Sequence, residues 1–407
     1  MGPLSISRLI FDTIPQLYQA SAGKYPFDIQ INRENVRAYS LIPLSPALVE
    51  YVRKSNAIWE ELRPMTEGDI SQILEREWIQ QKFVVDWLQT HTQVKEWGLI
   101  LDYARRLSRR LTESQLKAKT IVVEPSLSGA TGIKLSDESY WKVFDQLGST
   151  THTFFRIDQN LNILGYHALS RTEDKSDSQF RFYPSFLHPV IKQLKSEDSV
   201  VVHISENGGI MIANSKGLVA SKRVLDSWTV YDIEHVVGSV SEILKPQLEQ
   251  NNCRSKPHGV VRSLFQILFD IMTKMNGGLV ILDEPDRVDQ YLMHGIAKGD
   301  NSTLNMIFEH EPCNELLFSN AESRKLVELS SVDGAIVLDL HGNLIQVGSM
   351  VMAHPTAPNR FGTREAAGYS VAKNGGTAFK ISEDGHMSLF FTTPELTESE
   401  VHRFDFR

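Results

Sequence analysis

The stretch from residue 258 to residue 282 constrains the fold of this 407-residue chain more than any other. Residues 258–275 place apolar side chains at helical spacing on one broad face, which predicts an amphipathic helix that packs on a core. An Asn-Gly-Gly sequence at 276–278 ends the helix, because glycine readily adopts the conformation of a helix C-terminus. Residues 279–282 are entirely apolar, as in a strand of a buried sheet.

Further helix and strand signals follow this pair. They are a helix over 321–329, strands over 335–340 and 344–350, a helix over 363–373, and a hairpin of strands over 377–382 and 386–391. This pattern predicts an α/β domain over residues 256–400, with a central mixed β-sheet flanked by helices. A polar stretch at 245–256, which contains Pro246, is expected to be the linker before it.

Two other regions are predicted upstream of this domain. Residues 1–118 are expected to be mainly helical after a mixed start, with helices over 69–88 and 93–111. Residues 119–250 carry several strand signals and a helix signal, which predicts a second α/β module. Its pattern of two hairpins and a helix is typical of a small sensory or regulatory domain.

Composition narrows the class of protein. The formal net charge of −8 argues against a nucleic-acid binder. Two cysteines, Cys253 and Cys313, cannot staple a chain of this length, which favours a reducing compartment. We see no signal peptide and no run of about 20 apolar residues, so we expect a cytoplasmic protein with no membrane span.

Three short segments carry residue types suited to phosphate chemistry. Asp333 precedes Gly334 and Ala335 at the start of a strand, where the carboxylate could hold a metal and the glycine could admit a ligand close to the backbone. An alternative is that Asp333 only caps a turn.

The second segment, Gly362-Thr363-Arg364, opens a helix, whose free N–H groups and dipole suit a phosphate. Arg364 adds a planar fork of donors. The third segment, Ser382-Glu383-Asp384, ends a strand and offers carboxylates to a metal. The alternatives are that Thr363 is only a helix N-cap, and that the acidic segment is only a hairpin turn.

Four segments, in this order, resemble motifs of the catalytic domain of bacterial diadenylate cyclases. That family has a strand of the type G-A-L-[IV]-V-I-E, a D-G-A sequence opening a strand, a G-T-R-H-R sequence opening a helix, and S-E-E after a strand. The matching segments are Gly278–Glu284 (GLVILDE), Asp333–Ala335 (DGA), Gly362–Arg364 (GTR) and Ser382–Asp384 (SED). The resemblance covers residues 256–393, about one third of the chain.

The resemblance implies a nucleotidyltransferase that joins two ATP molecules into cyclic di-AMP and releases pyrophosphate. Two such domains meet face to face, each with one ATP, so self-association is expected. The cofactor would be Mg²⁺ or Mn²⁺. The implied roles are catalysis for Asp333 and Arg364, metal binding for Asp333 and Glu383, and nucleotide binding for Gly334, Ala335, Gly362, Thr363, Arg364 and Ser382.

The chain departs from the family at three positions. Glu365 and Ala366 stand where the family has His and Arg after G-T-R, and Val332 stands where it usually has His. Glu365 brings an anion near a polyanionic substrate, although cations such as Lys380 could compensate for it. A catalytically inactive module that senses ATP or a cyclic dinucleotide is therefore the alternative function. A structural partner in a larger complex is a third interpretation, with no specific support.

Overall fold

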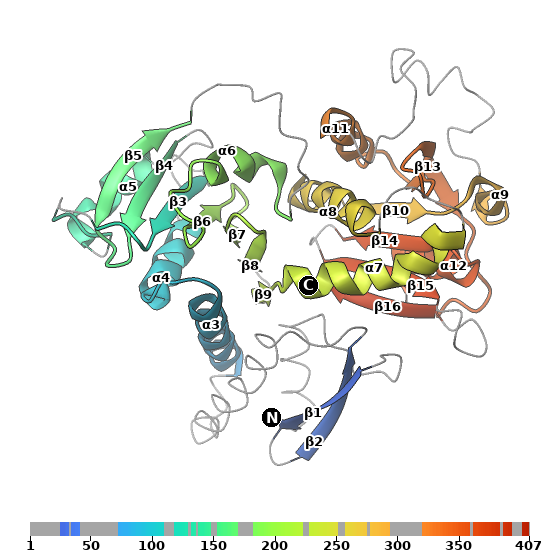
Figure 1. The fold of residues 1–407 in the computed structure, drawn as a ribbon, viewed down its shortest axis with the longest axis horizontal. Helices are drawn as coiled ribbons and strands as arrows, with labels where there is room; N and C mark the ends of the chain where they lie inside the picture. Colours follow the sequence, from blue (N-terminus) through green and yellow to red (C-terminus); the bar gives the residue numbers. More distant parts are fainter. Residues whose placement is uncertain are drawn as a thin grey trace. The chain divides into compact units, whose positions relative to one another are not determined.

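The computed structural model of the 407-residue chain forms two compact units (Figure 1). The first is made mainly of residues up to 233, and the second mainly of residues 234–407. The residues that the structure describes are 25–31, 34–40, 72–109, 118–128, 132–135, 137–147, 153–169, 182–222, 228–250, 257–274, 277–293, 320–358, 361–382, 386–392 and 401–406.

The first unit is built on a seven-stranded mixed sheet with the strand order β5-β4-β3-β6-β7-β8-β9. Only β3 and β4 are parallel among the paired strands. The strands are β3 (Lys119–Glu124), β4 (Thr153–Asp158), β5 (Ile163–Ala168), β6 (Val200–Ile204), β7 (Ile210–Ala213), β8 (Leu218–Lys222) and β9 (Trp228–Val230).

Helices cover both faces of this sheet. On one face, α3 (Gln72–His91) and α4 (Trp97–Ser108) bury Trp87, Trp97 and other apolar side chains against the strands. The short α6 (His188–Ile191) packs on β6, and the adjoining Phe186 lies against His203 of that strand. In the sequence, η2 (Glu138–Tyr140) and α5 (Trp141–Leu147) come between β3 and β4, and η3 (Ser185–Leu187) precedes α6.

The second unit is built on another seven-stranded mixed sheet, with the order β11-β13-β12-β10-β14-β15-β16. Strands β10 and β12 are parallel, and the other neighbours are antiparallel. The strands are β10 (Gly278–Leu282), β11 (Leu292–Met293), β12 (Ala335–Leu338), β13 (Leu344–Val351), β14 (Thr377–Ile381), β15 (Met387–Thr392) and β16 (Val401–Phe406).

The helices of the second unit also lie on two faces. On one face, α12 (Thr363–Lys373) packs on β14 and β15, and its Val371 and Ala372 share a core with Leu279 and Ala335. On the other face lie α8 (Pro257–Lys274) and α11 (Asn320–Leu329), which contact each other. The remaining helices are α7 (Ile233–Gln250) and the short α9 (Pro285–Val288).

The predicted mixed α/β fold class is confirmed, and so are most elements of the C-terminal third. Helix α12 begins and ends at the predicted residues, because Gly362 precedes it and Asn374 follows it before two glycines. The strand β10 is fully buried, as its apolar sequence indicated.

Three features differ from the sequence-based expectations. Helix α7 continues through Pro246 to Gln250, so the predicted linker is partly helical. The side chain of Gln247 explains this extension, because it donates to the carbonyl of Gly375 (3.0 Å) and accepts from Thr377 Oγ1 (3.1 Å). The second difference is the added edge strand β16. The third is a two-stranded sheet, β1 (Tyr25–Ile31) and β2 (Glu34–Ser40), in the region expected to be mainly helical.

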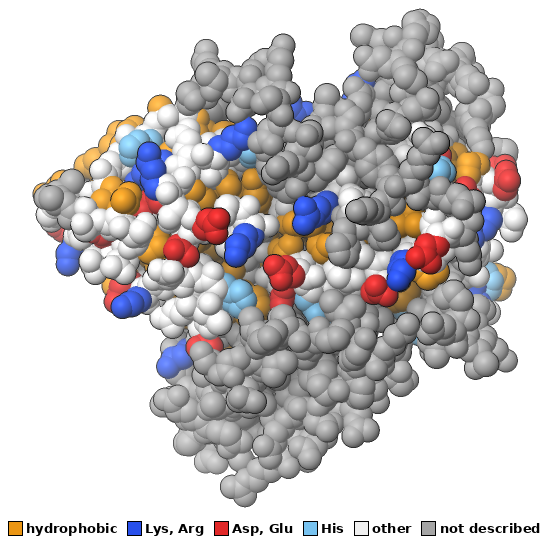
Figure 2. Space-filling model, viewed as in Figure 1, with side chains coloured by type: hydrophobic (Ala, Val, Ile, Leu, Met, Phe, Trp, Pro, Cys, Tyr) orange, Lys and Arg blue, Asp and Glu red, His pale blue; other side chains and the backbone are white. Residues whose placement is uncertain are grey.

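The described helices include none that is both long and apolar enough to cross a membrane. On the face shown in Figure 2, basic and acidic side chains of the described residues are interspersed rather than gathered by sign.

Candidate functional site

The floor of the site is one row of neighbouring residues across the second sheet. Leu279 of β10 pairs with Ala335 of β12 on one side and with Lys380 of β14 on the other. Ala335 in turn pairs with Ser349 of β13. Residues in one such row point to the same face of a sheet, here the face that α12 covers.

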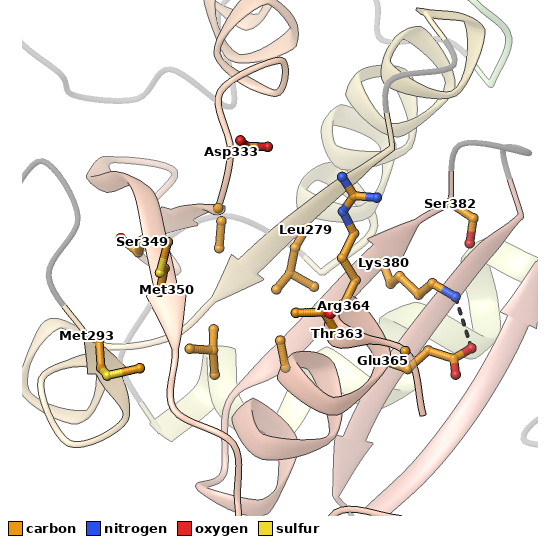
Figure 3. Close-up of a pocket in the computed structure, with 15 residues that line it drawn as sticks. Leu279, Met293, Asp333, Ser349, Met350, Thr363, Arg364, Glu365, Lys380 and Ser382 are labelled. Carbon is orange, nitrogen blue, oxygen red and sulfur yellow. Dashed lines mark hydrogen bonds and ion pairs between the residues drawn. The ribbon is translucent and has the colours of Figure 1, made fainter. Parts of the chain in front are cut away.

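A pocket of about 1010 Å³ lies between this row and the start of α12 (Figure 3). Its volume is at the upper end of the roughly 300–1,000 Å³ typical of small-molecule sites. All predicted site residues that the structure describes line it, namely Asp333, Gly334, Ala335, Gly362, Thr363, Arg364 and Ser382. Glu383 lies outside the described residues, as does Asp384.

The start of α12 presents backbone donors to the pocket. Gly362 occupies the N-cap position in an extended conformation and has no side chain that could accept from the first N–H groups of the helix. Thr363 is the first helical residue and is exposed, so the alternative that Thr363 is the N-cap is wrong. The first N–H groups and the helix dipole therefore favour an anion at this point. In Figure 3 the Arg364 side chain extends from the helix start into the pocket.

Glu365 is held by two cations and does not stand as an isolated anion. Its Oε1 accepts from Lys380 Nζ at 3.0 Å and from Arg403 Nη1 at 3.1 Å. Burial raises the pKa of this carboxyl, but the hydrogen bond and charge of Lys380, followed by the charge of Arg403, outweigh it and lower the pKa. The backbone N–H of Gly362 also bonds to Glu365, as in half of a capping box.

The ion-pair network continues to the edge of the sheet. Arg403 Nε donates to Asp405 Oδ1 at 2.6 Å, and Ser388 Oγ donates to the same oxygen at 2.6 Å. Lys380, Ser388 and Asp405 are successive partners in one row across β14, β15 and β16. The compensation for Glu365 that the sequence allowed from Lys380 is thus present, and β16 supplies a second cation.

Gly334 has a packing role as well as a place in the pocket. It has a φ of +110°, and a Cβ there would lie 2.4 Å from the carbonyl carbon of Gly348 on β13. Gly348 itself has a φ of +71°. The neighbouring backbone therefore excludes a side chain at Gly334, and the positive φ of Gly348 would strain one there, next to a bulge between Ala335 and Ile336. The strand pairing, in addition to any ligand, requires the glycine of the D-G-A segment.

The donors that the described residues bring to the pocket suit a metal that is also held by a substrate. Among the described residues there is no group of three His, Cys, Asp or Glu side chains that could hold an ion. Asp333 is an exposed carboxylate at the pocket wall. Mg²⁺ commonly binds through one or two carboxylates, waters and substrate phosphates. One carboxylate beside a candidate phosphate site fits this mode.

The apolar wall of the pocket was not among the predicted site residues. Leu279, Met293, Met350 and Val351 line it, and the two methionines are among the exposed large apolar residues. In Figure 3 the methionines lie on the opposite side of the pocket from Lys380 and Ser382. Methionine is flexible and its sulfur makes favourable contacts with aromatic rings. No motif marks these positions, because β11 is only two residues long and β13 reads as an ordinary strand.

Comparisons with known proteins add little. No protein-family model and no curated protein matches this sequence. Among solved structures, the chain is similar to a hypothetical membrane spanning protein from Bacillus cereus, with 9% identity and a TM-score of 0.27 over 42% of this chain and 74% of that one. It is also similar to a double mutant of DacA from Staphylococcus aureus, with 16% identity and a TM-score of 0.24 over 36% of this chain and 85% of that one. Neither likeness is close enough to decide what the pocket binds.

Proposed function

We propose that the second unit is a nucleotidyltransferase of the diadenylate cyclase type, which condenses two ATP molecules into cyclic di-AMP or a related cyclic dinucleotide. One observation supports this most strongly. The D-G-A, G-T-R and serine segments are far apart in the sequence, yet they line one pocket that is large enough for a nucleotide.

The two sides of the pocket suit the two parts of a nucleotide. The start of α12 and Arg364 would hold phosphate oxygens through N–H groups and a guanidinium fork. Met293 and Met350 would contact the base. Such positioning accounts for most of the catalysis expected in phosphoryl transfer, where the protein has little covalent chemistry to perform.

Asp333 would orient the attacking 3′-hydroxyl, and Asp333 and Glu383 would hold Mg²⁺ or Mn²⁺ together with the phosphates. The bound ion would supply charge neutralisation and a lowered pKa for the hydroxyl. Ser382, at the end of β14, would reach a phosphate oxygen.

The charges at the pocket wall balance. Asp333 and Glu365 oppose Arg364 and Lys380, so the wall offers no net positive charge to the phosphates of ATP. Binding of ATP should therefore depend strongly on the divalent ion that accompanies it.

The same balance favours the second candidate function, an inactive module that senses a nucleotide. Lys380 donates to Glu365, which leaves its charge less available to a phosphate. The cyclase family has two basic residues at the positions of Glu365 and Ala366. A sensor needs affinity for its ligand but no in-line geometry between two nucleotides.

A product screen separates the two functions. The purified chain is incubated with each of the four ribonucleoside triphosphates and with Mg²⁺ or Mn²⁺, and products are resolved by mass spectrometry. We expect a cyclic dinucleotide and pyrophosphate from ATP. The Asp333→Asn variant should form no detectable product while it unfolds at the same temperature as the wild type. Binding of ATP without turnover in every metal would favour the sensor, and wild-type turnover by Asp333→Asn would refute the assigned site.

A further inference from the structure

The two units share one strand topology. Without the outer strands β9 and β11, the sheet orders are β5-β4-β3-β6-β7-β8 and β13-β12-β10-β14-β15-β16. Counted along the chain, the first and second strands of each set are the parallel pair at the centre, and every other neighbour is antiparallel. Helices also match, because α4 and α8 precede the central strand, while α6 and α12 precede the fourth strand on the opposite face.

The turn after the second strand is the same in both sheets. In the first unit Asp158 accepts from the N–H of Asn160 and Asn162 and from the Asn162 side chain. In the second unit Asp339 accepts from the N–H of His341 and Asn343 and from the Asn343 side chain.

The backbone of these two turns also agrees. Leu161 has a φ of +65° at the position where Gly342 has a φ of +80°, and Leu161 is the one described non-glycine residue with a positive φ. Leucine rarely adopts this conformation, so its presence there indicates a turn whose geometry the surrounding fold imposes.

A second segment, after the fourth strand, matches in sequence, and the residues that flank it make the same hydrogen bond. Residues 204–208 read Ile-Ser-Glu-Asn-Gly and residues 381–385 read Ile-Ser-Glu-Asp-Gly. The Ser205 N–H donates to the carbonyl of Gly209 at 2.8 Å, and the Ser382 N–H donates to the carbonyl of His386 at 2.8 Å. In this alignment His203 of the first unit is equivalent to Lys380 of the second. The strand pairing in each sheet then makes Thr120 equivalent to Leu279, and Phe154 equivalent to Ala335.

The matched positions differ in what fills the space above the sheet. Where the second unit has Ala335 beside an open pocket, the first has Phe154, which is fully buried and stacks on His167 with ring centroids 5.5 Å apart. Where the second unit has Lys380, the first has His203. The Phe186 ring lies 4.8 Å from the His203 ring, and Thr120 Oγ1 lies 3.0 Å from its Nδ1.

We infer that the first unit is a second copy of the cyclase-type fold whose nucleotide position is closed by its own side chains, so that each chain offers one nucleotide site. The first unit has Thr153 and Phe154 at the places of Gly334 and Ala335, and it has no Gly-Thr-Arg sequence before its fourth strand. The closed copy follows from the fold alone. The number of sites rests on the proposed function.

Two measurements on the full-length chain test the inference. The first is equilibrium binding of a non-hydrolysable ATP analogue with Mn²⁺, for which we expect one analogue per chain and a complete loss of binding in Arg364→Ala. Two analogues per chain, or one that remains in Arg364→Ala, would overturn the inference.

The second measurement needs no nucleotide. Wild-type chain is treated with diethyl pyrocarbonate, and modified histidines are mapped by mass spectrometry. We expect His203 to stay unmodified under conditions that modify the exposed His341, and to react in Phe186→Ala. Equal reactivity of the two histidines in the wild type would show an open first unit and overturn the inference. If no analogue binds, the proposed function fails, and the wild-type histidine map still decides whether the first copy is closed.

Discussion

The two sheets of this chain have the same strand order, but they differ in what lies above one row of residues. This row contains Thr120 in the first sheet and Leu279 in the second. In the second unit the row carries Ala335 and leaves a pocket of about 1010 Å³. In the first unit the row carries Phe154, and aromatic and imidazole rings occupy the space. The comparison teaches that a fold supplies positions for a site, whereas a few side chains decide whether a site exists.

The largest difference in turnover is expected between variants of Glu383 and Glu206, which stand at matched positions of the two Ile-Ser-Glu segments. Glu383→Gln should lower product formation about 100-fold, because it removes a carboxylate expected to hold the metal at the phosphates. Glu206→Gln, at the matched position of the first unit, should leave turnover unchanged. Initial rates of cyclic dinucleotide formation measure both. Equal losses in the two variants would show that the first copy takes part in catalysis.

Dilution tests whether the second pocket comes from another chain. If only one pocket per chain is open, a symmetric product needs two chains. Tenfold dilution should then lower the rate about 100-fold wherever dimers are scarce, by mass action. Rates are compared with the association state measured by sedimentation at the same concentrations. Strict proportionality between rate and concentration in a purely monomeric range would contradict the two-chain requirement.

Acid should lower the free energy of unfolding of the first unit through His203, the residue matched to Lys380 of the second unit. Burial lowers the pKa of His203 from 6.5 to about 4. The unfolded chain therefore binds a proton that the folded chain excludes between these values, so stability falls as pH drops from 6.5 towards 4. The loss should be about 3 kcal/mol over that window.

Urea unfolding at several pH values measures this effect. His203→Gln should remove the part of the pH dependence that comes from His203, since glutamine does not titrate and can still bond to Thr120. The exposed His341→Gln serves as the control and should leave the dependence as in the wild type. An unchanged pH profile in His203→Gln would show that His203 is not the group responsible.

The smallest effect is expected at Glu365, the residue that most separates this pocket from the cyclase family. Glu365→Gln should release Lys380 towards phosphate while glutamine still caps the helix start. Because the ion pairs are partly exposed, their loss is worth about 1 kcal/mol, and ATP should bind about fivefold more tightly. Calorimetry in Mg²⁺ and in Mn²⁺ measures the change. The control Glu328→Gln, on α11, removes a largely exposed ion pair with Lys274 of α8. Weaker binding with an altered metal preference would show instead that Glu365 recruits a metal.

The local signals of the C-terminal third were sufficient to predict most of its elements. Helix α12 has its stop and start signals beside it, and β10 is apolar throughout, so neither needs distant residues to be recognised. The candidate site was predictable for a similar reason, because each of its segments stands at the start or end of such an element. Their meeting in one pocket required the strand order, which no segment encodes alone.

Other features depend on distant partners and could not be predicted in that way. The contact between Glu365 and Arg403 exists because β16 pairs with β15, and β16 follows a polar stretch that hid its alternation. The duplicated fold was hidden because the loops between matched strands differ in length, so equivalent residues are not a fixed distance apart. The two Ile-Ser-Glu segments were the available signal, but five residues do not define a repeat.

The meeting of Gly334 with Gly348 has a consequence for genetics. A random screen for inactive variants would recover substitutions at both positions, and the former would be taken as proof of a catalytic motif. Yet a side chain at Gly334 strikes main-chain atoms of the neighbouring strand, so such a variant would lose its sheet geometry before its chemistry could be judged. Loss of activity in a Gly334 variant therefore reports the pairing of β12 with β13 as well as any part in the reaction, whereas Asp333→Asn leaves that pairing in place and tests the chemistry alone.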